Sequence, residues 1–201
     1  MLSVLIWLGC GTVPEEAVAP PVEAVAVTDP ALLEIEAVAA AEAAAKAAGG
    51  ALKKRLMSAL AEGGPEHAVG VCADEAQGLT ALSLVGQRAR AGRASLRTRN
   101  PGNVGPEWVA AWLTEQGERP AAGVTGLSSA HRDGDVVVGR FLAPIPVEAP
   151  CLSCHGGPDQ IAPAVAAVLS ERYPKDQAVG YAEGDLRGAL WAEVRLPVVV
   201  E

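Results

Sequence analysis

The sequence predicts an α+β fold, with helices in its first half and an antiparallel sheet in its second. Three observations lead to this prediction. The first third is rich in alanine and carries apolar residues at helical spacing, whereas the later part changes to short apolar runs separated by turns. A length of 201 residues suffices for one ordinary domain with extensions. We therefore expect one antiparallel sheet flanked by helices, preceded by a long N-terminal helix.

The helical part begins with a clear start signal and contains two glycine pairs. Thr28 or Asp29 can cap the first turn, and Pro30 suits the first helical position. Gly49-Gly50 predicts a break or kink, and Gly63-Gly64-Pro65 predicts the end of this helix. The predicted helices cover an Ala-rich segment 31–64 and the segments 66–84, 107–115 and 160–173.

Strand patterns dominate the second half. Segments 122–129 and 135–145 predict two strands on either side of an Asp133-Gly134 turn, and segments 177–181 and 189–200 predict closing strands. Before them, five arginines occur within twelve residues, which we interpret as a solvated loop or helix face unless some of them bind an anion. These arginines are Arg88, Arg90, Arg93, Arg97 and Arg99.

Residues 151–155, Cys-Leu-Ser-Cys-His, form the C-x-x-C-H pattern of c-type haem attachment. Two thiols three residues apart can add to the two vinyl groups of one haem, and the adjacent His155 can bind the iron axially. A structural zinc site or a dithiol redox pair uses the same residue types and stays an alternative. We expect one covalent haem c at Cys151 and Cys154, with His155 as an axial ligand.

The second axial ligand has four candidates, Met57, His67, Cys72 and His131. His131 lies in a polar turn, where an exposed imidazole is expected, and a methionine is ordinarily a flexible core residue. His67 and Cys72 are five residues apart, so a helix separates them by about 140° and they cannot both face one haem. Cys72 shares the apolar stripe of its helix, where residue type alone favours a small buried side chain.

The N-terminus resembles the end of a bacterial lipoprotein signal peptide. Its short apolar run ends in Gly9-Cys10, and it is far below the roughly 20 residues that span a bilayer. Two features depart from the pattern: no Lys or Arg precedes the run, and Trp7 stands where leucine is usual, so an ordinary signal peptide or an apolar tail are alternatives. We predict a signal peptide end at 1–9, lipidation at Cys10 and a flexible tether over 10–30.

These assignments agree with one another in compartment and in charge. Bacteria attach c-type haem on the outer side of the inner membrane, so we expect an exported, periplasm-facing lipoprotein of the outer membrane. With lipid at Cys10 and haem at Cys151 and Cys154, only Cys72 remains, so no disulfide framework is expected. A net charge of −8 argues against nucleic acid as the main partner.

Four sequence blocks occur together in a recognisable order and spacing. They are residues 69–76 around Cys72, 92–108 with the Arg-Asn-Pro-Gly-Asn run, 151–156 with the haem motif, and 173–189. Over roughly residues 55–200 the chain resembles a c-type haem domain with a PAS-like fold, found alone or as the sensor part of bacterial histidine kinases. Val109 departs from the acidic residue that this family often has.

The resemblance implies a PAS-like haem domain over residues 65–201, in which Cys72 faces His155 as the second axial ligand. Independently, Arg93 and Arg99 are candidates to pair with the haem propionates. A thiolate ligand would favour ferric iron, and its release on reduction would open the iron to another ligand. We therefore predict electron transfer or redox sensing rather than enzymatic turnover, with a redox or signalling protein as partner and a homodimer through the N-terminal helix.

Three alternative functions share some of these residues. A haem-based gas sensor would use the same site with a releasable Cys72. A peroxidase-type enzyme would need His131 or His67 as a distal acid–base group, and a zinc-binding structural module would use Cys72 together with residues 151–155.

Overall fold

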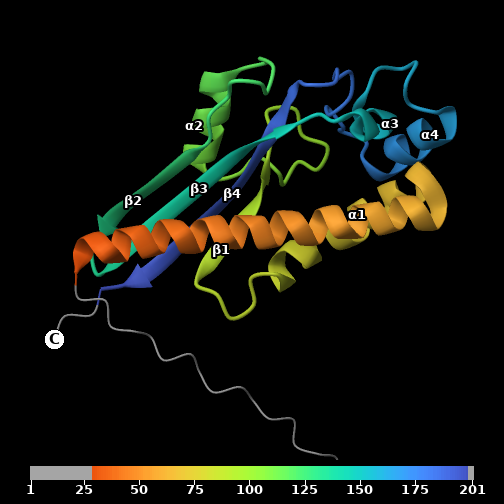
Figure 1. The fold of residues 1–201 in the computed structure, drawn as a ribbon. Helices are drawn as coiled ribbons and strands as arrows, with labels where there is room; N and C mark the ends of the chain where they lie inside the picture. Colours follow the sequence, from red (N-terminus) through yellow and green to blue (C-terminus); the bar gives the residue numbers. More distant parts are fainter. Residues whose placement is uncertain (1–28, 199–201) are drawn as a thin grey trace, which may run out of the picture.

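The computed structural model describes residues 29–198, in which a long, sharply bent helix lies against a four-stranded antiparallel sheet (Figure 1). This arrangement confirms the predicted α+β class and the long N-terminal helix. The elements in chain order are α1 (Pro30–Leu82), β1 (Ala89–Ala94), α2 (Glu107–Gln116), β2 (Leu127–Asp133), β3 (Val136–Pro146), a 3-10 turn (Ala149–Cys151), α3 (Leu152–His155), α4 (Pro163–Arg172) and β4 (Leu186–Pro197).

Helix α1 begins where the sequence predicts, because the Asp29 carboxylate accepts a hydrogen bond from the backbone N–H of Ala31 at 2.9 Å. The predicted break at Gly49-Gly50 is wrong, since the backbone there is helical. Gly49 instead allows close packing: a Cβ at this position would lie 2.7 Å from Cδ2 of Leu190 on β4. The only non-helical residues within α1 are Gly63 and Gly64, the latter with φ of 72°.

The kink at Gly63 and Gly64 divides α1 into a first arm, residues 30–62, and a second arm, residues 65–82, which runs back beside it (Figure 1). Ala59 on the first arm packs with Ala68 and Val71 on the second. The Arg55 guanidinium also forms two hydrogen bonds to the carboxylate of Glu75, at 2.7 and 3.0 Å. The two arms therefore form a helical hairpin rather than two independent helices.

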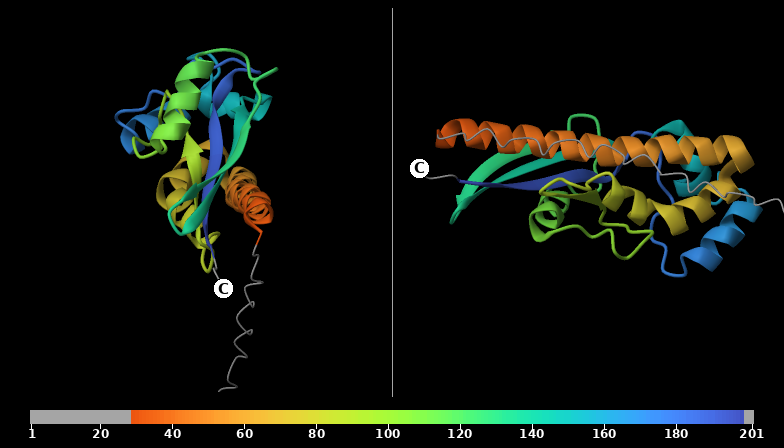
Figure 2. Two further views of the ribbon diagram at one scale, coloured as in Figure 1. Left: turned by 90° about the vertical axis from the view of Figure 1, so that its left-hand side faces the viewer. Right: turned by 90° about the horizontal axis from the view of Figure 1, so that it is seen from below.

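The sheet has the strand order β1-β4-β3-β2, and every neighbouring pair is antiparallel. The first arm of α1 crosses one face, where small side chains allow a very close approach. Ala41, Ala44 and Ala45 pack on Ala192 and Val194 of β4. The second view of the molecule shows this helix lying along the sheet (Figure 2).

Helix α2 packs on the opposite face near one end of the sheet. Trp112 and Leu113 of α2 pack against Leu142 of β3 and Ala189 of β4, with Trp108 and Trp191 at the edge of this cluster. The two faces thus have different coverings, a long alanine-lined helix on one and a short aromatic helix on the other.

The strands differ from the prediction in several places, and β4 also begins and ends three residues earlier than expected. Part of the arginine run, residues 89–94, forms β1 instead of a loop or helix face, and it pairs along β4. The first predicted strand begins only at Leu127, and the predicted strand over 177–181 is irregular chain. Cys10 and most of the predicted tether lie outside the described residues. Over residues 29–198, no helix has both the length and the apolar character needed to cross a membrane.

Candidate haem site

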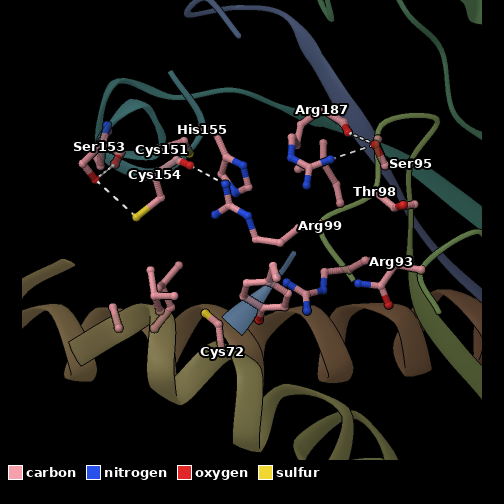
Figure 3. Close-up of a pocket in the computed structure, with 18 of the residues that line it drawn as sticks. Cys72, Arg93, Ser95, Thr98, Arg99, Cys151, Ser153, Cys154, His155 and Arg187 are labelled. Atoms are coloured by element: carbon pink, nitrogen blue, oxygen red, sulfur yellow. Dashed lines mark hydrogen bonds between the residues drawn. The ribbon is translucent and has the colours of Figure 1, made fainter. Parts of the chain in front are cut away.

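One large cavity separates the haem motif from the second arm of α1 (Figure 3). The 3-10 turn and α3 place Cys151, Cys154 and His155 on one wall, which we call the motif wall. The second arm of α1 places Cys72 on the facing wall, the helix wall. About 1090 Å³ of empty space lies between the two walls and in the open mouth of the cavity.

The imidazole of His155 is fixed in one tautomer. Its Nδ1 lies 2.7 Å from the carbonyl oxygen of Ala178, and because a carbonyl only accepts, Nδ1 carries the proton. Burial, reinforced by the charge of Arg99, lowers the pKa of His155 from 6.5 to about 3, so the ring is neutral. The lone pair on Nε2 is therefore available to a metal ion, as in other histidine ligands held by a carbonyl.

Arg99 holds the motif wall in place. Its side chain is 12% exposed, and its Nε donates to the carboxylate of Asp176 at 2.9 Å. Its Nη2 donates to the carbonyl oxygens of Cys154 and Ala178. The same carboxylate of Asp176 accepts from the backbone N–H of Ala178 at 2.8 Å. Arg99 thus ties the motif to the segment that orients His155.

The thiols around the cavity are free, and those of Cys72 and Cys154 are both partly buried. Burial raises the pKa of the Cys72 thiol, a rise that the positive charge of Arg93 opposes in part. Burial also raises the pKa of the Cys154 thiol. The protein alone therefore favours neutral thiols here, and a thiolate at Cys72 would require the charge of a bound metal ion.

The end of the cavity opposite the Cys151 and Cys154 thiols is positively charged. Arg93 and Arg187 line it, and within residues 29–198 neither forms an ion pair. The Nη1 of Arg187 donates to the hydroxyl of Ser95 at 2.7 Å, but its Nε is buried without any hydrogen-bond partner. In Figure 3 these guanidinium groups lie across the cavity from Cys154. A buried, unpaired cation of this kind calls for an anionic partner.

The lining fits a haem in three respects. The vinyl and propionate groups of a haem lie on opposite edges of the macrocycle, as do the thiols and the guanidinium groups of the cavity. An imidazole and a thiol face each other from opposite walls, which suits axial ligation. The apolar side chains of Leu56, Leu60 and Val69 on α1 line the cavity and supply a surface for the flat ring.

The comparisons with known proteins concern this same part of the chain. The Tll0287-like family model matches residues 34–197. The chain belongs to the Tll0287-like family. A solved structure described as that of the cyanobacterial heme-protein Tll0287 is 24% identical, covers 65% of this chain and 74% of its own, and superposes with a TM-score of 0.46. No curated protein matches the chain.

In this Tll0287-like chain, six of the predicted haem-site residues line one cavity. The three rejected ligand candidates lie elsewhere: Met57 is 51% exposed on α1, His67 lies beside Glu62, and His131 is exposed on β2. Within the described residues, no group of three or more His, Cys, Asp or Glu side chains is arranged to hold a metal ion. The six residues are Cys72, Arg93, Arg99, Cys151, Cys154 and His155.

The sequence predicts no role for Arg187 beyond packing near the cofactor, and none for Ala178. Arg187 falls within the fourth block of the family resemblance, but its position in the cavity depends on Ser95, 92 residues away. Ala178 acts through its backbone carbonyl, which residue type does not reveal. The fourth block contains both residues, but a residue type cannot show that the backbone carbonyl of Ala178 is used.

Proposed function

We propose that this protein binds one haem c covalently and works by electron transfer or redox sensing. The observation that carries the proposal is the meeting of the C-x-x-C-H wall and Cys72 across one cavity with arginines at its far end. Membership of a family named after a haem protein supports it. When bound, the haem would supply a reversible one-electron change at its iron.

Each part of the cavity then has a role. Cys151 and Cys154 would hold the haem: addition of each S–H group across one vinyl group would form a thioether bond without any oxidant. His155 Nε2 and Cys72 Sγ would hold the iron, and the apolar side chains would keep water away from it. Arg93 and Arg187 neutralise the propionates, while Arg99 adds positive charge and holds the motif wall.

Redox change suits this site better than turnover. His67 and His131, the candidate distal acid–base groups for a peroxidase, do not line the cavity. A haem iron with one ligand from each wall would have no free coordination position for a substrate. The functional partner is then another protein that gives or takes an electron, or that reads the redox state.

A gas-sensing function is the second candidate. The helix wall around Cys72 is formed by small and apolar side chains, among them Ala68 and Val69. If Cys72 leaves the iron on reduction, that wall suits a small uncharged ligand. Carbon monoxide binding to the reduced protein is the direct measurement, and its absence would exclude this candidate.

We further propose that the protein is exported and held at the outer membrane by lipid at Cys10, facing the periplasm. The short apolar run that ends at Gly9-Cys10 supports this. Leu32 and Ile35, 56% and 66% exposed near the start of α1, support a homodimer through the first arm. Replacement of Cys10 by serine should move the protein from the membrane to the soluble fraction.

Absorption spectroscopy of the exported protein tests the central proposal. We expect a Soret band whose colour stays with the protein after extraction with acidified acetone, because thioether bonds resist it. A colourless protein would contradict haem binding, and colour that is fully extracted would contradict covalent attachment. A colourless protein that contains one zinc per chain would establish the zinc alternative.

A further inference from the structure

A second cavity adjoins the first, and Ser95, Arg187 and Gly188 line both. It lies between the C-terminal end of α2 and the segment before β4, and it holds about 650 Å³ of empty space including its mouth. The proposed haem attachment uses none of its other lining residues. Its contents are therefore a separate question.

The lining of this cavity is rich in guanidinium groups. Arg97, Arg119 and Arg187 face two carboxylates, those of Glu118 and Asp185. Glu118 is exposed, and Asp185 accepts the backbone N–H of Ala182 at 2.8 Å. None of the three arginines forms an ion pair with any residue from 29 to 198, so the cavity carries an excess of positive charge.

Two of these arginines are held by neutral acceptors. Arg97 donates from Nε and Nη2 to the carbonyl oxygens of Gln177 and Val179. Arg119 donates from the same two nitrogens to carbonyls of residues 116 and 115 at the end of α2. These bonds fix both side chains but leave their charges uncompensated. Among the residues that the structure describes, neither Nη1 has a hydrogen-bond partner. The donors are thus positioned before any ligand arrives.

Arg187 and the apolar part of the lining complete the argument. The Nε of Arg187 is buried without a partner, which is costly unless a ligand or a propionate accepts from it. Leu113 and Leu186, 2% and 8% exposed, also line the cavity. Fixed guanidinium donors beside apolar side chains suit an organic acid better than an inorganic anion. We propose that the second cavity binds a small carboxylate through Arg97 and Arg119, with Arg187, which the haem proposal pairs with a propionate, at the boundary of the two cavities.

Tyr181 connects this cavity to His155. The guanidinium carbons of Arg97 and Arg187 lie 4.3 and 5.2 Å from the centre of the Tyr181 ring. The Tyr181 ring meets the His155 ring edge to face at 6.4 Å, and its backbone N–H donates to the carbonyl of His155 at 3.0 Å. A carboxylate bound here adds negative charge near the motif wall. This consequence rests on the proposed haem: the ligand should stabilise ferric iron and lower the reduction potential.

Calorimetric titration of the purified full-length protein with succinate and acetate tests the site, with succinamide as a neutral analogue of succinate. We expect at least one acid to bind and the diamide not to bind. Arg97→Gln and Arg119→Gln should each weaken binding about ten- to a hundredfold, since each removes a charged donor. Arg195→Gln, which removes an ion pair with Asp133 at the exposed end of the sheet, should leave the affinity unchanged.

The outcomes separate this proposal from the haem proposal. If neither acid binds, if the diamide binds equally, or if Arg119→Gln leaves the affinity unchanged, the site is overturned. The comparison of acid with diamide uses the unaltered protein and does not depend on folded variants. Binding without a lower midpoint potential overturns only the connection through Tyr181. A colourless protein would overturn haem binding, and the calorimetric result would still decide the site.

Discussion

The two walls of the main cavity are built in different ways. On the motif wall, polar contacts fix the position of His155: Arg99 binds Asp176 and two carbonyls, one of which also accepts from the imidazole. On the helix wall, Cys72 lies on an arm that follows two non-helical glycines, among apolar side chains. The comparison sets an imidazole that is fixed by its own hydrogen bond against a thiol whose helix packs through apolar side chains. In the proposed haem site, this difference would suit a second ligand that changes with redox state.

The largest expected effect comes from removing both thiols of the motif wall. In the double variant Cys151→Ser, Cys154→Ser, no thioether bond can form, and we expect haem retained after acid–acetone extraction to fall at least tenfold. Cys72→Ser is the matched control, because it removes a thiol from the helix wall only and should keep covalent colour. If the double variant and Cys72→Ser lose colour equally, covalent attachment does not depend on the motif wall alone.

Cys72→Ala tests the helix wall next. Loss of an anionic ligand should change the ferric spectrum and raise the midpoint potential by on the order of 0.1 V, because axial ligands set haem potentials over a wide range. Met57→Ala, an exposed position nearby on α1, should alter neither property. An unchanged ferric spectrum in Cys72→Ala would show that Cys72 is not a ligand.

Arg99→Gln should destabilise the protein by about 3 kcal/mol, because it leaves the largely buried carboxylate of Asp176, 11% exposed, without its cation. Urea unfolding of the unaltered and variant proteins measures this free energy. Arg99→Lys keeps the charge but cannot donate from a planar fork, so it should recover only part of the loss. Asp176→Asn should be milder, and a variant as stable as the unaltered protein would show that Arg99 does not hold the motif wall.

The smallest effects concern the kink of α1. Gly64 has a φ of 72°, so Gly64→Ala should destabilise the protein by about 1 kcal/mol. Gly50→Ala provides the opposite control: it lies in exposed, regular helix with open space around it, and alanine there should stabilise by about 0.5–1 kcal/mol. Thermal unfolding of both variants measures the difference. If both substitutions change the stability in the same direction, the kink is not where the structure places it.

Local signals predicted the start of α1, the haem motif and its ligand candidates, because capping and motif spacing depend on neighbouring residues. Local signals failed where contacts between residues distant in the sequence determine the secondary structure. The break at Gly49-Gly50 does not occur because Leu190 of β4 packs against this point of the helix. Strand β1 was overlooked although Ala89-Arg90-Ala91 alternates with the period of a strand, because its arginines were read as a solvated surface.

The site shows the same division. The sequence motif identified His155, whereas the carbonyl that selects its tautomer belongs to Ala178, 23 residues later. Arg93 and Arg99 were predicted together as propionate partners, and this stays a prediction for both. The structure nevertheless distinguishes them, since only Arg99 has its donors engaged by Asp176 and backbone carbonyls. Such engagement depends on the folded loop and could not be predicted from the spacing of arginines.

One close contact has a mechanical consequence. A Cβ at Gly139 of β3 would lie 2.1 Å from the carbonyl oxygen of Ala37, so the first arm of α1 rests on the sheet backbone itself. With no side chain between them, the arm has little room to slide or rotate along β3. A displacement of Cys72 would then be absorbed at Gly63 and Gly64 and would not travel along α1 as a piston movement. In the proposed lipoprotein, the membrane-proximal end of the domain would stay fixed relative to the sheet, and a partner would detect the redox state at the cavity mouth.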